Sequence, residues 1–239
     1  MNIIICKNYE EMSLRAAELL AEVVKSKPAC VLGLATGSTP VGMYQNLIRM
    51  NKAGEISFKD VTTVNLDEYY PIDPENDQSY RYFMNVNLFD HVDIDKAKTS
   101  VPDGTAKDPE AEGRRYEALI SALGGIDVQI LGIGRNGHIG FNEPDASLVL
   151  DTHVTDLTPS TIEANSRFFA SEKDVPRRAL TMGIGSIFKA KKIILMVSGT
   201  EKKAAVSSLF ERKLSTTSPV TMLNLHPDVT LVCTRDVVD

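Results

Sequence analysis

The sequence predicts an α/β protein built on a mostly parallel, doubly wound (Rossmann-like) sheet with helices on both faces. Short apolar runs typical of buried strands alternate with longer segments whose apolar residues recur at helical spacing. Such alternation favours parallel strands with helical crossovers. The chain has 239 residues, 43% of them hydrophobic, and no repeat or linker rich in Pro, Gly or Ser divides it. We therefore expect a single domain over residues 1–239.

The first half of the chain shows this alternation most regularly. In residues 10–25, apolar side chains from Met12 to Val24 recur roughly every three or four positions, which predicts a helix. The expected elements are strand 2–6, helix 10–25, strand 30–34, helix 41–49, strand 61–66, a short helix near 80–89 and a longer helix over about 109–123.

The second half continues the pattern after a strand at residues 126–130. The expected elements are then a helix near 160–169, a turn-rich segment at 183–188, strand 192–197, helix 202–210 and a last strand at 229–233. Ligands of doubly wound sheets bind outside the carboxyl ends of the strands. Loops that follow strands are therefore the places to look for function.

The loop at residues 131–144 (LGIGRNGHIGFNEP) is the most informative of these. It carries four glycines within nine residues, which let the backbone turn sharply and approach a ligand. Into this turn the chain places Asn136, His138, Asn142 and Glu143. These groups form a candidate site for acid/base chemistry and hydrogen bonding.

Three other interpretations of this loop are possible. The spacing of its glycines formally fits a dinucleotide fingerprint, but Pro144 interrupts the helix that the fingerprint requires. A lone histidine is often structural, although Glu143 in the same turn favours a catalytic His138. A metal site could draw on His138, Glu143 and the Asp67-Glu68 pair, but no typical ligand spacing supports it. We therefore expect neither a bound cofactor nor a metal.

A second loop, at residues 35–40 (ATGSTP), lies between a strand and a helix. Gly37, Ser38 and Thr39 stand where a helix N-terminus presents free N–H groups, which is the outline of an anion site. The loop is not a P-loop, because no lysine follows Gly37. The alternative is a plain turn with a Ser or Thr helix cap.

A third loop, at residues 65–70 (NLDEYY), ends the strand expected over residues 61–66. It brings the adjacent carboxylates of Asp67 and Glu68 to the ligand edge of the sheet. Adjacent carboxylates usually mark a solvated turn. In this position, one of them is a candidate general base.

Charge and cysteine content exclude several classes of protein. A net charge of −6 and a pI near 5.3 disfavour nucleic-acid and anionic-membrane partners, so any phosphate must be held locally. Cys6, Cys30 and Cys233 are odd in number and lie in apolar runs, which indicates buried free thiols. Neither a signal peptide nor a transmembrane run is evident, and we expect a cytoplasmic protein.

With these loops in view, the chain resembles the glucosamine-6-phosphate deaminases, which convert glucosamine 6-phosphate into fructose 6-phosphate and ammonia. The matching motifs are spread over nearly the whole chain in the family's order. They are residues 32–40 (LGLATGSTP), 65–69 (NLDEY), 134–144 (GRNGHIGFNEP), 164–169 (ANSRFF) and 199–202 (GTEK).

The resemblance implies a role for each residue that matches a motif. Asp67 would carry a proton from sugar C2 to C1, and His138, oriented by Glu143, would open the pyranose ring. Asn136 stands where many members have aspartate, and a neutral amide can only hydrogen-bond. Gly37, Ser38 and Thr39 would hold the phosphate, with charge-assisted contacts from Arg167 and Lys202. Without the family pattern, these two cations look like ordinary surface residues.

Two other functions are compatible with parts of the same sequence pattern. A 6-phosphogluconolactonase shares the fold, but members of that family resemble Gly-His-Thr-Ala-Ser at the Gly-His loop and have Asp-Glu-Arg in place of Asp67-Glu68-Tyr69. Glu143 and Tyr69 therefore disfavour this alternative. A catalytically silent sugar-phosphate-binding regulator would have lost the base.

Hexameric deaminases are activated by N-acetylglucosamine 6-phosphate through an arginine and a lysine, and the aligned residues here are His153 and Thr155. We therefore expect a short, non-allosteric form that is a monomer or small homo-oligomer.

Overall fold

The computed structural model describes residues 1–166, 169 and 171–238. Its centre is a seven-stranded sheet in which every neighbouring pair of strands is parallel. In spatial order the strands are β1 (Asn2–Cys6), β10 (Val229–Thr234), β9 (Lys192–Val197), β6 (Val128–Leu131), β2 (Val31–Leu34), β3 (Thr62–Asn65) and β5 (Thr99–Ser100).

The central strands are continuous apolar runs rather than alternating ones. β10 reads VTLVCT and is buried at each of its six positions, and β2 and β6 are likewise buried along their whole length. A strand with this pattern is covered on both faces, because an alternating pattern would leave one face for solvent. β-Branched residues such as Val229 and Val232 pack well on such a pleated surface.

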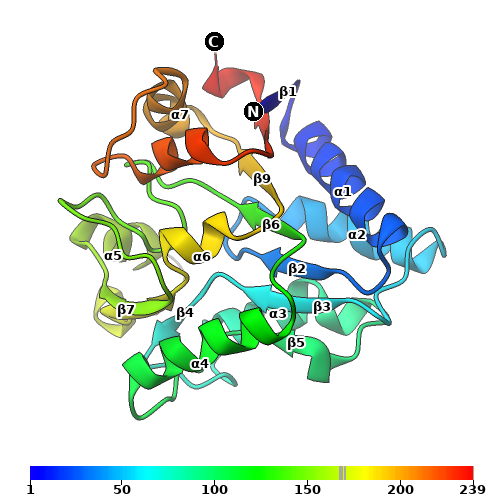
Figure 1. Cartoon of the computed structure of the whole chain (residues 1–239), viewed down its shortest axis with the longest axis horizontal. Coiled ribbons are helices and arrows are strands. Elements are labelled where there is room, and N and C mark those ends of the chain that lie inside the picture. The colour runs from blue at the N-terminus through cyan, green and yellow to red at the C-terminus, as the bar shows by residue number, and fades with distance from the viewer. Residues whose placement is uncertain (167–168, 170, 239) are drawn as a thin grey trace.

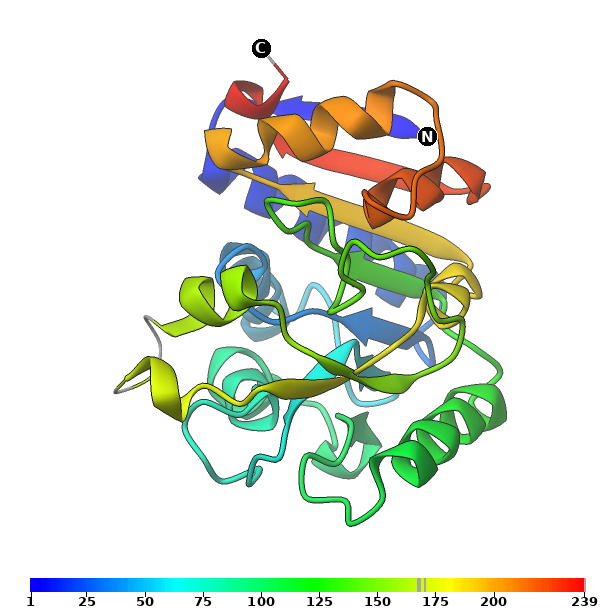
Figure 2. The same ribbon diagram turned by 90° about the vertical axis from the view of Figure 1, so that its left-hand side faces the viewer.

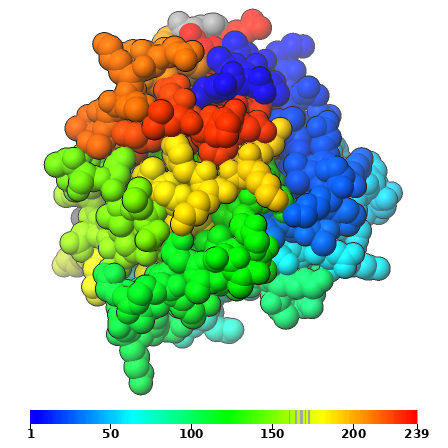
Figure 3. Space-filling model, viewed as in Figure 1, coloured from blue at the N-terminus to red at the C-terminus, as the bar shows by residue number. Residues whose placement is uncertain are grey.

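Helices cover both faces of this sheet (Figure 1). α1 (Tyr9–Ser26) and α2 (Val41–Lys52) lie on one face, and α4 (Pro109–Ala122), α6 (Ile184–Phe188) and α7 (Lys203–Phe210) lie on the other. The space-filling view shows α1 and α2 in blue along the right of the molecule, and α4, α6 and α7 in green, yellow and orange across its centre and left (Figure 3). The predicted doubly wound α/β fold is therefore confirmed.

Local sequence explains where the two longest helices begin. Asn8 caps α1, since its side chain accepts the N–H of Glu11 at 2.9 Å. Asp108 caps α4 in the same way at the N–H of Ala111, and Pro109 occupies the first turn, where its missing N–H costs nothing. None of the described helices has the length and apolarity needed to cross a bilayer. All three cysteines are buried free thiols, as predicted.

A second, antiparallel sheet lies beside the central one and was not predicted. It has the order β4 (Asp67–Tyr70), β8 (Arg178–Thr181) and β7 (His153–Asp156), and it packs with α3 (Tyr80–Asn87) and α5 (Pro159–Ser166) (Figure 2). The expectation that residues 67–70 form a loop is wrong: they pair with a strand more than a hundred residues away. Residues 183–188 likewise form the short helix α6 rather than turns alone.

Candidate active site

The strand order places four functional loops at one edge of the central sheet. β9, β6, β2 and β3 are neighbours and parallel, so the segments that follow them share the carboxyl edge. The chain moves from β2 to β3 in one direction and returns to add β6 on the other side of β2. β2 and β6 therefore flank the topological switch point, where ligands of this architecture bind.

The loop after β6 is a series of tight turns, and no helix begins within it. The N–H of Gly134 donates to the carbonyl of His138 at 2.9 Å, and Gly137 has a φ of 86°. A Cβ at Gly134 would lie 2.3 Å from the His138 ring, so only glycine lets the backbone close over the imidazole. This geometry fits the predicted ligand loop and excludes the dinucleotide fingerprint, which needs a helix here.

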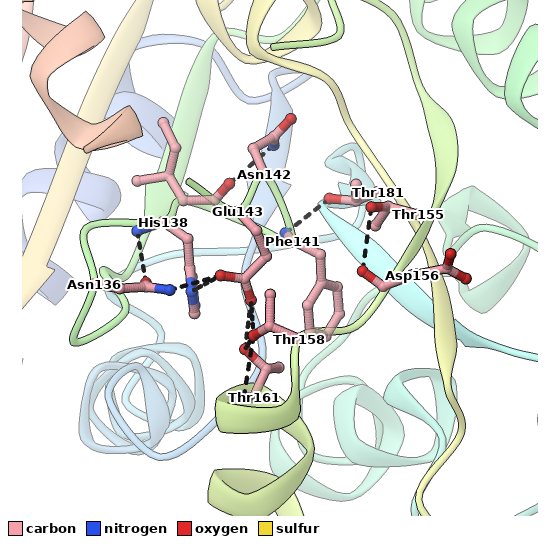
Figure 4. Close-up of polar contacts among 11 residues, drawn as sticks. Asn136, His138, Phe141, Asn142, Glu143, Thr155, Asp156, Thr158, Thr161 and Thr181 are labelled. Carbon is pink, nitrogen blue, oxygen red and sulfur yellow. Dashed lines mark hydrogen bonds and ion pairs between the residues drawn. The ribbon is translucent and has the colours of Figure 1, made fainter. Parts of the chain in front are cut away.

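His138 and Glu143 form a pair within this loop (Figure 4). The distance from His138 Nδ1 to Glu143 Oε2 is 3.2 Å, and Asn136 Nδ2 donates to the same oxygen at 2.7 Å. Asn136 Oδ1 in turn accepts the N–H of His138 at 3.2 Å. All three predicted residues are therefore brought together. Asn136 acts through hydrogen bonds alone, as its neutral amide requires.

The second carboxylate oxygen of Glu143 contacts the start of α5. It accepts the hydroxyls of Thr158, at 3.3 Å, and Thr161. Burial by itself raises the pKa of Glu143, but the hydrogen bond and charge of His138, with help from Thr161 and Asn136, lower that pKa to about 2. An ionised Glu143 favours the tautomer in which Nδ1 carries the proton, which leaves Nε2 of His138 available as an acceptor.

Asp67 reaches the same place from β4. It lies opposite Thr181 in the antiparallel sheet, and Thr181 Oγ1 accepts the N–H of Phe141 at 3.0 Å. A Cβ built on Gly140 would lie 2.9 Å from Thr181 Oγ1 and 3.7 Å from Asp67 Oδ2. The glycine loop thus passes directly over the Asp67 carboxylate. Burial, together with the charge of Glu68, raises the pKa of Asp67 to about 8.

Glu68 points to the other side of β4 and is fully engaged there. Its carboxylate accepts the backbone N–H groups of Tyr69 and Tyr80 on Oε1, and that of Arg81 on Oε2, at 2.8 to 2.9 Å. Successive residues of a strand face opposite sides, so only one of the two carboxylates can face the glycine loop. Asp67 is therefore the candidate base of the pair.

The loop after β2 fits the predicted anion site. Gly37 has a φ of 87°, which other residues rarely adopt, and the Tyr9 hydroxyl lies 3.0 and 3.1 Å from the carbonyls of Ser38 and Thr39. α2 has Pro40 as its N-cap and no side-chain capping bond, so Ser38 and Thr39 do not serve as helix caps. Their hydroxyls remain available for a ligand.

Of the two predicted phosphate-binding cations, the structure describes Lys202 but not Arg167. Lys202 ends the short 3₁₀ helix Thr200–Lys202 that follows β9, where it is half-buried at the carboxyl edge of the sheet. Arg167 lies outside the described residues, immediately after α5. No cluster of three or more His, Cys, Asp or Glu side chains suited to a metal occurs in the part of the chain that the structure describes.

The site also contains Asn142, which the sequence placed in the glycine loop, and three threonines that sequence reasoning missed. Asn142 Nδ2 donates to the carbonyls of Ile139 and Met182 at 2.9 and 2.8 Å and so ties the glycine loop to the end of β8. Thr158 and Thr161 are three residues apart at the start of an expected helix, a spacing typical of capping residues that could have drawn attention to them. Thr181 carried no such signal.

Comparison with known proteins agrees with this arrangement. A family model described as glucosamine-6-phosphate isomerases/6-phosphogluconolactonase matches residues 7–232. Curated relatives include the glucosamine-6-phosphate deaminase of Clostridium perfringens, 56% identical over 99% of this chain and 98% of its own. The glucosamine-6-phosphate deaminase of Thermoanaerobacter pseudethanolicus is 55% identical over 99% of this chain and 93% of its own.

Solved structures show the same fold. A monomeric glucosamine-6-phosphate deaminase superimposes with a TM-score of 0.97 at 47% identity, covering 99% of this chain and 98% of that one. The 6-phosphogluconolactonase of Trypanosoma cruzi has a TM-score of 0.78, covering 99% of this chain and 95% of that one. At only 18% identity it shows a likeness of fold alone. The chain therefore belongs to the glucosamine-6-phosphate isomerase/6-phosphogluconolactonase family.

Proposed function

We propose that this protein is a glucosamine-6-phosphate deaminase that converts D-glucosamine 6-phosphate and water into D-fructose 6-phosphate and ammonia. The observation that carries the proposal is the meeting of two acid/base groups at one strand edge: buried Asp67 under the glycine loop, and the His138–Glu143 pair within that loop. Curated relatives at 55% to 56% identity bear the same name. We place the reaction in cytoplasmic amino-sugar catabolism.

Ring opening comes first in the proposed mechanism. The pyranose exposes its C1 aldehyde when a base removes the C1 hydroxyl proton and an acid protonates the ring oxygen. His138 can relay this proton through Nε2, because Glu143 holds the proton on Nδ1. Glu143, Asn136 and the Thr158 and Thr161 hydroxyls fix the imidazole plane, which is how an orienting shell supports a catalytic histidine.

Asp67 then acts on the open chain. The aldehyde and the ammonium on C2 make the C2 proton acidic, and the Asp67 carboxylate removes it to give an enolamine. Return of the proton to C1 produces the imine of fructose 6-phosphate. Water adds to this imine and ammonia leaves, so one water is consumed for each ammonia released.

The charge at Asp67 suits an amino sugar. In the unliganded protein Asp67 is buried next to Glu68, and its pKa is raised to about 8. A substrate ammonium next to Asp67 supplies the opposite charge, which favours the ionised carboxylate. The substrate thereby helps to generate the base that acts on it.

A lactonase of the same fold and a silent binding protein are the competing functions. A lactonase has no use for a base that faces C2, and a silent binder needs neither Asp67 nor the His138–Glu143 pair. The deciding assay follows ammonia and ketose phosphate together from glucosamine 6-phosphate, with 6-phosphogluconolactone as the comparison substrate. Equal amounts of both products support the proposal, and hydrolysis of the lactone alone would overturn it.

Removal of either proposed phosphate cation should raise KM. Arg167→Ala and Lys202→Ala each remove a charge-assisted hydrogen bond, worth roughly 1.5–3 kcal/mol, which corresponds to a KM increase of about ten- to a hundredfold. Steady-state kinetics would measure it, with Lys203→Ala, the neighbouring exposed lysine on α7, as the matched control. An unchanged KM in both variants would make Arg167 and Lys202 ordinary surface charges.

The enzyme should show hyperbolic kinetics and no activation by N-acetylglucosamine 6-phosphate. The positions aligned with the activator's two cationic ligands are His153 and Thr155 on β7, and Thr155 carries no charge. Without differential affinity for a phosphate, an effector cannot shift one state over another. Steady-state rates across substrate concentration, measured with and without the compound, test the kinetics. Light scattering tests whether the protein is a monomer or small oligomer. Sigmoidal curves or a hexamer would contradict it.

A further inference from the structure

Glu68 holds helix α3 against β4, next to the proposed base. α3 begins after Ser79, whose hydroxyl accepts the N–H of Tyr82 at 2.9 Å. Glu68 accepts the neighbouring N–H groups of Tyr80 and Arg81, so two of the first free donors of the helix end on this one carboxylate. Its side chain is only 2% exposed. Such a carboxylate acts both as a helix cap and as a fixed negative charge.

The two carboxylates share one short strand and point in opposite directions. Asp67 lies under Gly140, whereas Glu68 lies under the first turn of α3. The Glu68 Oε1 atom also accepts the N–H of Tyr69 at 2.9 Å, a contact within β4 that fixes the direction of the Glu68 side chain. A rotation of β4 that moves Asp67 away from the glycine loop would have to break the two contacts between Glu68 and α3.

We propose that Glu68 is a positioning residue for the reaction: it fixes the direction of the Asp67 carboxylate through α3 and places a second carboxylate next to it. This inference rests on the proposed role of Asp67 as the base. Asp67 must be held within hydrogen-bond reach of both C1 and C2, and a misplacement of about 1 Å can cost a factor of roughly a hundred in rate.

The surroundings of the pair support the electrostatic part. Arg81 faces Glu68 from α3, and both line a cavity of about 200 Å³ with Asp103. The Arg81 guanidinium is held away by Thr99, to which it donates at 2.8 and 3.0 Å. Tyr69, Tyr80 and Tyr116 surround the carboxylates, and burial raises the pKa of each of these phenols, which stay neutral. Burial raises the pKa of Glu68 to about 7, and the N–H donors of Tyr80, Arg81 and Tyr69 and the charge of Arg81 limit that rise. The pKa of Asp67 is raised further, to about 8, so Glu68 loses its proton first and Asp67 then ionises against that charge.

Two substitutions separate position from charge. In Glu68→Gln, one oxygen can still accept from Tyr69 and Tyr80, but an amide N–H₂ then meets the N–H of Arg81, and the charge is gone. Glu68→Asp keeps the charge but shortens the reach to α3. Asp127→Asn is the matched control: Asp127 is also a buried carboxylate that accepts a strand N–H, that of Val31 at 2.8 Å, at the opposite end of the sheet.

The readouts are kcat, KM and the pH dependence of kcat/KM, whose acid limb reports the free enzyme. Glu68→Gln should lower kcat roughly ten- to a hundredfold with KM within about threefold. Its acid limb should move to lower pH by about one unit, because the repelling charge is lost. Glu68→Asp should lose kcat but keep the wild-type acid limb. Asp127→Asn should change neither.

Each outcome decides the inference. The inference is overturned if the acid limb does not move in Glu68→Gln, or if kcat stays within threefold of wild type in both Glu68 variants. It is also overturned if Asp127→Asn shows the lower kcat and the shifted acid limb expected of Glu68→Gln. If Glu68→Gln does not fold, a wild-type kcat in Glu68→Asp is the overturning result. Should the wild-type protein release no ammonia, the proposed function fails instead. The carbon-13 NMR titration of the Asp67 carboxyl in wild type and Glu68→Gln then tests the effect of Glu68 without turnover.

Discussion

Replacing Asp67 by asparagine is expected to reduce turnover of glucosamine 6-phosphate by a factor of about a hundred to ten thousand, the usual cost of removing a general base. The amide has nearly the same shape, so the fold and the binding of sugar phosphate should persist. Ammonia release measures the rate, and equilibrium binding of fructose 6-phosphate measures the retained site. Turnover within threefold of wild type would exclude Asp67 as the base.

The same substitution should stabilise the protein, increasingly as pH rises. Burial and Glu68 raise the pKa of Asp67 from 3.8 in its ordinary state to about 8 in the folded protein. Between these values the unfolded chain has lost this proton and the folded chain keeps it, so the folded state loses stability as pH rises. Above the folded pKa the loss is complete. Asparagine carries no such cost.

Thermal unfolding of wild type and Asp67→Asn between pH 5 and 9 checks this sign. The difference in Tm should grow up to about pH 8 and then level off, and each 1 kcal/mol gained corresponds to about 2–4 °C for a chain of this size. Asn142→Asp provides the opposite control, since it adds a carboxylate to a buried position of the same site. A Tm difference that shrinks with pH would mean that Asp67 is ionised at little cost in the folded protein.

Much of the fold follows from local pattern, and the part that does not depends on distant partners. β1 and β9 each contain a run of consecutive apolar residues, and both were predicted at their true bounds. β4 reads DEYY and has no such signal. It becomes a strand because β8 pairs with it, and its buried carboxylates are tolerated because α3 supplies N–H groups to Glu68. No local feature of the sequence encodes that pairing.

The candidate site shows the same division. Its glycine loop was predicted because four glycines follow a buried strand and carry candidate acid/base and hydrogen-bonding groups, and His138, Glu143 and Asn136 do meet there. The contacts that fix Glu143 from α5 come from two threonine hydroxyls, which are common in any sequence. Their significance depends on the path of the chain through β7, which the sequence pattern did not reveal.

Glu143 is held on both of its carboxylate oxygens. Four groups approach its two oxygens, and each one donates: Asn136 and His138 to one oxygen, and the two threonine hydroxyls to the other. Only an acceptor-only group satisfies all four. A glutamine would present N–H₂ to two of these donors, and the imidazole would lose both its anchor and the negative charge that stabilises its protonated form.

Glu143→Gln should therefore lower kcat by a factor of about a hundred or more, because ring opening loses its acid/base group. Binding of an open-chain amino-alditol phosphate, which needs no ring opening, should stay within about threefold of wild type, since the phosphate loop and Asp67 are intact. Glu163→Gln, on the exposed side of α5, is the matched control and should match wild type in both measurements. A Glu143→Gln enzyme with wild-type kcat would show that ring opening does not depend on a charged partner of His138.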